Sequence, residues 1–378
     1  EASSPRQFEF LRLAGAAIGR QASDEALRSF LERLLARAEA RNAGPIALVS
    51  GLAGAMESGR LREAVRHAAG SRRAEQNLNR LIDQAIEIAK SNTDPVARRQ
   101  AACAILFLGN PIQVTEPLVD LMDASAPPEL MSASIQSFAN LNDADSARAL
   151  FERWGTLPLA GRNGVLSASP QSSAIRDAML NALKNKDISP AELPLSVADE
   201  LRRSASEGDP VLALLGADRS SDRGKVIESY KDCLSISADR AAGAKVFKTI
   251  CFNCHTVQRV GTPLGPDLIT VASRPKEELL VDILDPSRRV SPDFLGYTLA
   301  TTDGRVINGL IAAETSDTIT LRREQGEQVT ISRADVEQLR AGSKSFMPDG
   351  LEQKITPQDI ANLLALLRAP DRGLLEEQ

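Results

Sequence analysis

Two cysteines and a histidine lie close together in the stretch CFNCHTV, at residues 251–257. Cys251, Cys254 and His255 form a Cys-x-x-Cys-His pattern, which uses two of the four cysteines and one of the two histidines in the chain. Such a group occurs in three kinds of site: a redox dithiol, a zinc site, and the attachment point of a c-type haem. The surrounding sequence bears on each of the three.

Helical spacing places both thiols on one side of a helix predicted over residues 237–255. His255 stands at the end of this helix, where its imidazole can turn towards an iron whose porphyrin is held by two thioethers. This arrangement favours covalent attachment of a c-type haem. The positions that share the side of the two thiols are Gly243, Val246, Phe247, Ile250, Cys251 and Cys254.

The other interpretations have less support from the sequence. A redox dithiol is expected at the start of a helix, where the dipole lowers the pKa of a thiol. A zinc site needs four ligands, and the remaining candidates, Cys103, Cys233 and His67, are scattered along the chain. A purely structural cysteine pair leaves the adjacent His255 unexplained.

A second axial ligand for haem iron is commonly a methionine. Of the five methionines, only Met347 follows the Cys-x-x-Cys-His pattern, in the Gly/Ser/Pro-containing stretch GSKSFMPDG. An irregular loop there would present the thioether to the iron. The alternatives are a loop methionine that covers an apolar surface, and ligation by Lys344 instead.

Three stretches resemble class I cytochromes c. GAKVFKTICFNCHTV is similar to the first helix and haem motif of that family, with Gly243 and Phe247 ahead of the cysteines. LGPDL, which contains Pro266 and Leu268, resembles the loop that follows the motif, and SFMPDGL resembles the loop that supplies the methionine. The closing helix, expected to begin at Thr356 and Pro357, would cross the first helix near Gly243.

The resemblance implies one covalently attached haem c. The carbonyl of Pro266 would accept a hydrogen bond from the ring N–H of His255, which fixes the tautomer and increases donation to the iron. The iron ligands would be His255 and Met347. The implied cofactor-binding residues are Cys251, Cys254, His255, Met347, Pro266, Phe247 and Leu268.

The chain departs from that family in three respects. Its last helix has leucines where an aromatic residue usually meets the first helix, and no Trp follows the haem motif. About 40 residues with alternating apolar and polar positions are also inserted before the Met347 stretch. With this insertion, residues 237–370 resemble the C-terminal haem domain of large bacterial membrane-bound dehydrogenases. Those proteins carry a β-propeller and HEAT-like repeats upstream, and this chain has no propeller.

The elements around these residues differ between the two parts of the chain. Residues 1–235 show helical patterns, and a partial repeat of about 33 residues relates Pro95 to Pro128 and Ile105 to Phe138. We therefore expect a HEAT-like α-solenoid, with an irregular helical domain as the alternative. Residues 236–370 are expected to form the cytochrome c-like helical domain, with an antiparallel insertion of about four strands at 296–332 and a tail at 371–378.

Composition restricts the protein class. The 378 residues are 43% apolar and 25% charged, as in an ordinary globular protein of two or three domains. A net charge of −5 with mixed signs gives no footprint for nucleic acid. No apolar run reaches the roughly 18 residues that span a bilayer. The chain starts at Glu1 rather than Met, which indicates a processed protein or a piece of a longer one.

The sequence thus predicts a bacterial monohaem c-type cytochrome of the periplasm or another extracytoplasmic compartment. It would carry single electrons from a dehydrogenase, as a partner or part of the same protein, to a downstream acceptor, and would not itself be an enzyme. One alternative is a haem enzyme or sensor with an open or displaceable sixth ligand, which would reduce peroxide or bind a small gas. Another is an interaction scaffold with a structural haem.

Overall fold

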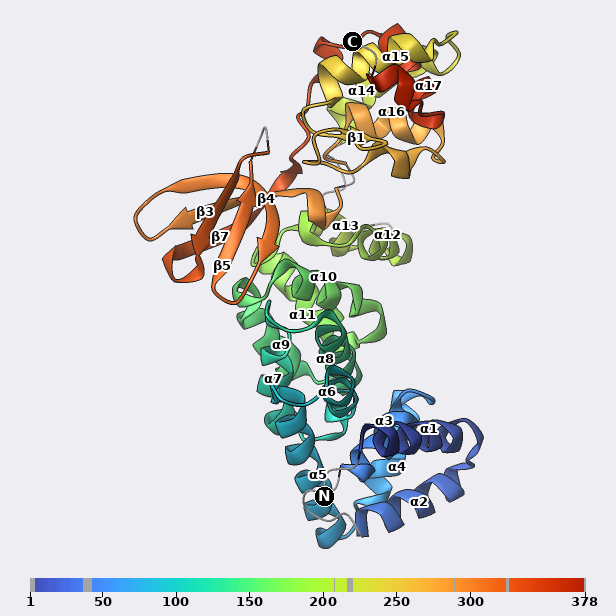
Figure 1. Cartoon of the computed structure of the whole chain (residues 1–378), viewed down its shortest axis with the longest axis vertical. Coiled ribbons are helices and arrows are strands. Elements are labelled where there is room, and N and C mark those ends of the chain that lie inside the picture. Colours follow the sequence, from blue (N-terminus) through green and yellow to red (C-terminus); the bar gives the residue numbers. More distant parts are fainter. Residues whose placement is uncertain are drawn as a thin grey trace. The chain divides into compact units, whose positions relative to one another are not determined.

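The computed structural model describes residues 4–36, 43–206, 208–215, 220–288, 290–323 and 326–376. The chain is mainly helical and carries a small antiparallel sheet, as predicted (Figure 1). It divides into two compact units, Glu1–Asn181 and Ala182–Gln378.

Among its described residues, the first unit contains helices and no strand (Figure 1). Helix α6 packs against α8, and α7 packs against α9. The helices are α1 (Pro5–Gln21), α2 (Asp24–Ala36), α3 (Gly44–Ala53), α4 (Ser58–Ala68), α5 (Arg72–Lys90), α6 (Val96–Cys103), α7 (Pro111–Asp120), α8 (Pro128–Leu141), α9 (Ala144–Glu152), α10 (Leu159–Ser167) and α11 (Ser173–Asn185), which ends in the second unit.

Helix ends in this unit follow from local sequence. Ser4 caps α1 in a reciprocal arrangement with Gln7, and Asp143 caps α9 by accepting a hydrogen bond from Ser146 N. Pro128 occupies the first position of α8, where a missing N–H costs nothing. The apolar side of each helix is buried, as Leu81 in α5 illustrates with 4% exposure.

The second unit begins well before the predicted boundary at residue 235. The hydroxyl of Tyr230 donates hydrogen bonds to the carbonyls of Glu352 (3.0 Å) and Ile355 (2.7 Å), so α14 packs on C-terminal elements. The helices of this unit are α12 (Leu195–Ser204), α13 (Pro210–Leu214), α14 (Ser220–Tyr230), α15 (Arg240–Val246), α16 (Lys276–Leu284), α17 (Pro357–Arg368) and α18 (Arg372–Glu376).

Helices α15 and α17 cross at Gly243, which confirms the expected crossing. A Cβ atom at Gly243 would lie 2.1 Å from the carbonyl oxygen of Asn362, so only glycine permits this approach. Thr356 caps α17 and Pro357 is its first residue, also as expected. The leucines of α17 that face the crossing, including Leu363 and Leu367, are buried.

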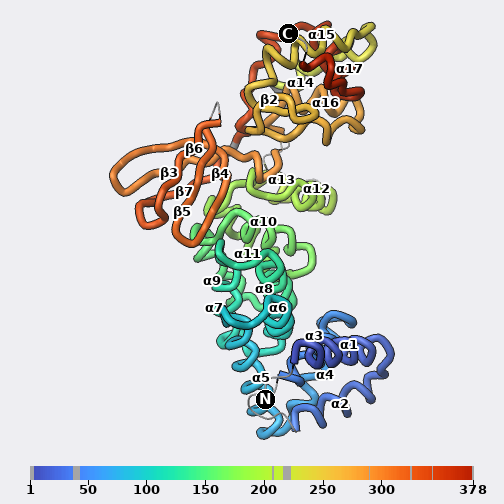
Figure 2. Tube along the Cα trace, in the orientation of Figure 1, coloured from blue at the N-terminus to red at the C-terminus, as the bar shows by residue number. Residues whose placement is uncertain are grey.

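A five-stranded antiparallel sheet lies between α16 and α17 in the sequence, in the order β6-β5-β4-β3-β7 (Figure 2). Its buried side packs Leu299, Ile319, Leu321 and Ile331 into one apolar cluster. The strands are β3 (Leu295–Thr301), β4 (Val306–Glu314), β5 (Thr318–Arg322), β6 (Gln328–Ser332) and β7 (Val336–Ser345). A separate two-stranded hairpin pairs β1 (Thr256–Val257) with β2 (Val260–Gly261).

The sheet extends further than predicted. The four strands expected at 296–332 are present, but β7 adds a fifth that pairs with β3. The first part of GSKSFMPDG is therefore strand rather than irregular loop, because Gly342 to Ser345 belong to β7.

The expected tail at residues 371–378 is also partly wrong. Residues 372–376 form α18, because Leu375 is buried at 3% exposure beside Phe247 and Leu366. Residues 377 and 378 lie outside the described part of the chain.

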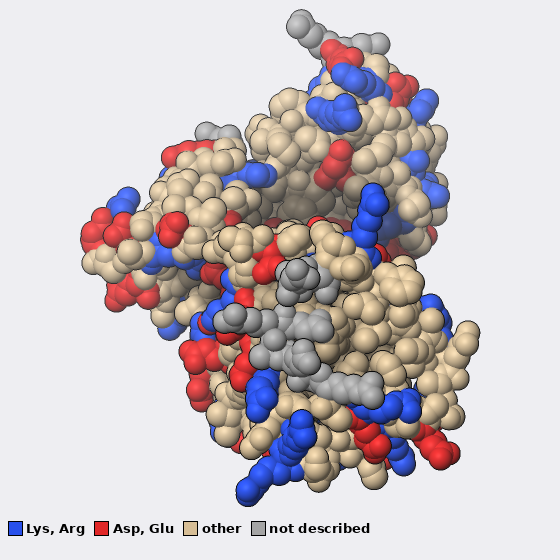
Figure 3. All heavy atoms as spheres, turned by 60° about the horizontal axis from the view of Figure 1, so that its bottom comes forward, with Lys and Arg blue, Asp and Glu red and all other residues tan. Residues whose placement is uncertain are grey.

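The mixture of basic and acidic residues in the sequence is also seen on the surface. On the face shown in Figure 3, basic and acidic side chains are interspersed. No helix in the described ranges is both long and apolar enough to cross a membrane.

Candidate functional site

The helix that leads to the Cys-x-x-Cys-His stretch is shorter than predicted. The α-helical part ends at Val246, and η6 (Phe247–Cys251) continues as a π-helical turn. Its defining bond runs from the N–H of Phe252 to the carbonyl of Phe247, at 2.9 Å. The helix predicted over 237–255 is therefore α-helical only over Arg240–Val246, π-helical over Phe247–Cys251, and has ended before Cys254 and His255. A π-turn adds one residue to a helical turn and often occurs at functional sites.

Both cysteines nevertheless line one cavity of about 500 Å³, together with His255. Its wall combines the segment after the cysteines, helix α16, and the chain at both ends of the sheet. Most of the lining side chains are apolar, among them Leu264, Leu279 and Phe294. A concave, largely apolar cavity of this size is typical of a cofactor or small-molecule site.

His255 is held in a defined orientation at this cavity. Its Nδ1 lies 2.9 Å from the carbonyl oxygen of Pro266. Because a carbonyl only accepts hydrogen bonds, Nδ1 carries the proton and Nε2 keeps its lone pair. The side chain is 9% exposed, and this burial lowers its pKa, while the bond to Pro266 acts in the opposite direction. A neutral imidazole with Nε2 available is the form that ligates a metal.

The loop after His255 fits closely against the imidazole. The carbonyl of Cys254 accepts hydrogen bonds from Leu264 N (3.1 Å) and Gly265 N (2.6 Å), which fold the loop back. A Cβ atom at Gly265 would lie 2.7 Å from Cε1 of His255. Glycine at this position therefore lets the loop carry Pro266 to the ring.

Met347 lines the same cavity from the opposite end of the unit's sequence. It lies two residues beyond the end of β7, and its N–H donates to the hydroxyl of Ser345 at 3.1 Å. Lys344, the alternative ligand, is exposed, pairs with Asp349 at 3.1 Å, and does not line the cavity.

The remaining predicted residues divide into two groups. Pro266 and Leu268 line the cavity. Phe247 does not, because its fully buried ring packs in the adjoining core with Leu363 and Leu366. Phe247 therefore supports the wall of the cavity rather than forming it.

One charged group at the cavity was missed in the sequence. Arg274 donates to Glu278 at 2.8 Å and also pairs with Asp282, and all three line the cavity. Its pKa is raised, mainly by the hydrogen bond to Glu278. Among the described residues of the wall, Arg274 is the one Lys or Arg. Arg274 lies just before α16, and the spacing of Glu278 and Asp282 is a signal, since residues four apart share one side of a helix.

Cys251 is held as a protonated thiol in this environment. None of the four cysteines forms a disulfide, and burial together with the neighbouring Cys254 raises the pKa of Cys251 to about 12. This shift is opposite to the one that activates a redox dithiol. Burial also raises the pKa of Cys103 to about 12, in keeping with its place inside the first unit.

A zinc ligand set is not found in the described residues. No group of three or more His, Cys, Asp or Glu side chains there is arranged to hold a metal ion. Cys233 lies in a core cluster with Leu280 and Ile360 and does not line the cavity.

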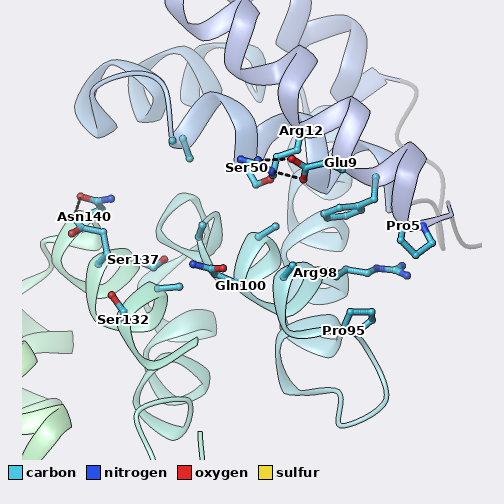
Figure 4. Close-up of a pocket in the computed structure, with 18 residues that line it drawn as sticks. Pro5, Glu9, Arg12, Ser50, Pro95, Arg98, Gln100, Ser132, Ser137 and Asn140 are labelled. Atoms are coloured by element: carbon cyan, nitrogen blue, oxygen red, sulfur yellow. Dashed lines mark hydrogen bonds and ion pairs between the residues drawn. The ribbon is translucent and has the colours of Figure 1, made fainter. Parts of the chain in front are cut away.

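A second cavity, of about 740 Å³, lies in the first unit between α1, α3, α6 and α8 (Figure 4). Its polar side chains include Gln100, Gln136 and Asn140, and its charged groups pair locally, Arg12 with Glu9 at 2.7 Å. It contains no Cys, His or Met among its described lining residues. The predicted site residues all belong to the second unit instead.

No protein-family model matches this chain, and a search of curated protein sequences finds no match either. The function of the site is therefore inferred from its own residues and geometry.

Proposed function

We propose that this chain is a monohaem c-type cytochrome that transfers single electrons. The observation that carries the proposal is one cavity lined by Cys251, Cys254, His255 and Met347. A c-type site needs these groups together, since two thioethers hold the porphyrin and His and Met fill the axial positions. The two half-buried thiols, neither of which forms a disulfide, and the oriented imidazole are compatible with this use.

The chemistry of the donor set fits the cofactor. Cys251 and Cys254 would hold the haem covalently, and His255 and Met347 would ligate the iron. When bound, haem c supplies a one-electron iron couple. Arg274 would pair with a haem carboxylate, since it is a cation within the cavity wall.

Two features of the chain would act on the bound haem. One orients its proximal ligand, His255, and the other would raise its reduction potential. Pro266 keeps the proton on Nδ1 of His255, which orients the ring and increases its basicity. The apolar wall favours the less charged ferrous state, and a methionine ligand acts in the same direction. With both axial positions filled, electron transfer is favoured over substrate chemistry at the iron.

The described helices support a HEAT-like repeat in the first unit. Packing of α6 on α8 and of α7 on α9 is what two successive helix pairs would give. Ile105 and Phe138, which the 33-residue repeat relates to each other, are both buried, at 0% and 2% exposure. We propose that this helical part is a scaffold that would hold the cytochrome-like domain against its redox partner.

The proposed partners are a dehydrogenase as electron donor and a downstream carrier as acceptor. An extracytoplasmic, bacterial location goes with the resemblance to the haem domains of membrane-bound dehydrogenases. In this assignment the sheet between α16 and α17 is an insertion into a class I cytochrome c-like domain, whose first and last helices cross at Gly243.

The deciding experiment is an absorption spectrum of the chain expressed with a haem-maturation system. The wild type should carry one covalent haem, reduce reversibly, and show the weak methionine–iron band in the far red. That band should vanish in Met347→Ala and persist in Met56→Ala, a methionine of the first unit. Absence of the band from the wild type would overturn the ligand assignment.

A paired variant tests covalent attachment. Cys251→Ser with Cys254→Ser should abolish covalent haem and leave the second unit poorly folded, while Cys233→Ala should retain haem. Haem that remains covalently bound to the double variant would contradict the proposal. Haem that cannot be reduced reversibly would favour a structural role.

A further inference from the structure

Met347 lies on a short segment whose two ends are both tied to the carboxyl end of α16. Six residues, 346–351, separate Ser345, the last residue of β7, from Glu352. Ser345 is hydrogen-bonded to Ser287 in the turn that follows α16. Glu352 pairs with Arg223, which also donates to the carbonyl of Leu284, the last residue of α16. The turn itself contributes Pro286 to the cavity wall.

The first tie is made by Ser287. Its hydroxyl accepts a hydrogen bond from the backbone N–H of Ser345 at 3.2 Å. The hydroxyl of Ser345 in turn accepts from the N–H of Met347 at 3.1 Å. Asp349 lies 3.5 Å from the Ser287 hydroxyl and pairs with Lys344 at 3.1 Å. The chain on both sides of Met347 is thus held against one turn.

The second tie is made by Arg223 of α14. Its guanidinium makes two bonds to the carboxylate of Glu352, at 2.7 and 2.8 Å. The same guanidinium donates from Nε to the carbonyl of Leu284 at 2.8 Å. The two side chains are only 20% and 17% exposed, so solvent screens the pair less than a surface pair. Glu352 raises the pKa of Arg223, and Arg223 lowers that of Glu352.

We propose that Ser287 and Arg223 are positioning residues that hold Met347 in the sixth-ligand position of the haem. This inference rests on the proposed cytochrome function and adds the means by which the axial methionine is kept in place. Neither residue lines the cavity, so both act through the segment that carries Met347.

The physical reason is the entropy of the segment. A thioether is a neutral ligand, and ordering a free loop opposes its binding to the iron. Fixing both ends of a six-residue span to one helix end removes most of that cost before the ligand binds. Loss of either tie would therefore favour the state in which Met347 is detached from the iron.

Imidazole binding to the oxidised haem protein measures this equilibrium, because imidazole competes with Met347 for the iron. We expect Ser287→Ala to bind imidazole about fivefold more tightly than the wild type, the effect of one net hydrogen bond. Arg223→Met should increase the affinity about tenfold, since it removes a charged pair. The far-red methionine band should be lost over the same range of imidazole concentration as imidazole binds. Ser287→Thr, which keeps the hydroxyl, should restore the wild-type affinity for imidazole.

Matched controls remove equivalent bonds elsewhere in the unit. Ser332→Ala removes a serine hydroxyl that accepts from a backbone N–H at 3.3 Å, and Arg372→Met removes an exposed pair with Glu376 at 2.7 Å. Both controls should leave imidazole affinity unchanged. If Arg223→Met does not fold, Ser287→Ala decides alone.

The outcomes separate this inference from the proposed function. Wild-type protein with haem and a methionine band, but unchanged imidazole affinity in both variants, would refute the positioning role and leave the cytochrome assignment intact. A wild type with no covalent haem or no methionine band would overturn the assignment and the inference with it.

Discussion

The imidazole of His255 is fixed from two sides by neighbouring backbone. The carbonyl of Pro266 accepts a hydrogen bond from its Nδ1–H, and Gly265 allows the loop to approach the ring. The two residues are adjacent in sequence, so one short loop determines both the tautomer and the orientation of the ring. Small changes in this loop should therefore alter the orientation of the His255 ring at the candidate site.

Gly265→Ala should destabilise the haem-loaded protein by about 1–3 kcal/mol, the usual cost of overpacking. The added Cβ would lie 2.7 Å from Cε1 and 2.9 Å from Nδ1 of His255, so the ring or the loop has to move. Urea unfolding measures how much the free energy of unfolding falls in this variant. Gly224→Ala is the control, because no described atom lies within 4 Å of a Cβ there. Equal stability of the two variants would contradict the close fit.

Asp285 should make stability depend on pH. It is 5% exposed, its Oδ2 has no hydrogen-bond partner among the described residues, and burial raises its pKa. The folded protein therefore keeps a proton that the unfolded chain releases above about pH 4, and the free energy of unfolding falls as pH rises through the raised pKa. The stabilisation that comes from protonated Asp285 is fully present below the pKa that Asp285 has in the unfolded chain.

Asp285→Asn cannot ionise, so it should remove that fall. At pH 7 we expect the variant to be more stable than the wild type by about 1 kcal/mol, the order of one unmet hydrogen bond. At pH 4 the difference should disappear. Thermal unfolding at both pH values checks this, and a difference that is the same at pH 4 and pH 7 would show that Asp285 does not titrate in this range.

Sequence spacing was enough to bring Cys251, Cys254 and His255 together, because three residues within five positions stay close even though the helical turn ends at Cys251. Met347 was found from its position after the motif, and it lines the same cavity. Arg274 was missed, because a charged residue just before a helix usually faces solvent. Only the tertiary packing of α16 shows that this side of the helix faces the cavity.

At the scale of elements, α17 follows from its local signals. Thr356 Oγ1 accepts from Asp359 N at 3.2 Å, and Asp359 Oδ2 accepts from Thr356 N at 3.0 Å. This reciprocal cap and Pro357 start the helix that crosses α15.

Thr356→Ala should therefore reduce the free energy of unfolding by about 1 kcal/mol, the usual value of an N-cap. Thr356→Ser keeps the hydroxyl and should lose much less. Urea unfolding of the haem-loaded chain provides the comparison. If alanine and serine have the same effect, the capping bond is not the source of stability at this end.

Strand β7 and the π-turn were missed for related reasons. Between Ala300 and Thr301 the pairing of β3 with β7 shifts register, so Val336 and Leu339 both face the apolar cluster although they are three residues apart. This bulge breaks the alternation by which strands are predicted. In η6 the extra residue of the π-turn shows only in the bond from Phe252 N–H to the carbonyl of Phe247, which the sequence pattern does not reveal.

At the scale of the whole molecule, the change from helical pattern to mixed pattern near residue 235 does not coincide with the division between compact units. That division falls at residues 181 and 182. Helix α14 looks like a continuation of the preceding helices in sequence. Its contacts with Glu352 and Ile355, more than 120 residues away, cannot be deduced from local patterns.

The two boundaries predict different behaviour for shortened chains. Residues 186–378 retain α14, whereas residues 236–378 lose the pair of Arg223 with Glu352 and the two hydrogen bonds of Tyr230. Val226 and Ile227 also pack on the apolar cluster beneath α17. Removing these contacts should cost at least about 2 kcal/mol, the sum of one charged pair and the one bond that the Tyr230 hydroxyl shares between two carbonyls.

We therefore expect residues 186–378 to attach haem and unfold cooperatively, with the same transition as the second unit of the full chain. Residues 236–378 should unfold at a markedly lower temperature and retain less of the far-red methionine band, because the tie at Glu352 is gone. Haem content, the band and the thermal transition are measured on all three chains. Equal stability of the two shortened chains would place the working boundary at residue 235 and show that α14 contributes nothing to the haem unit.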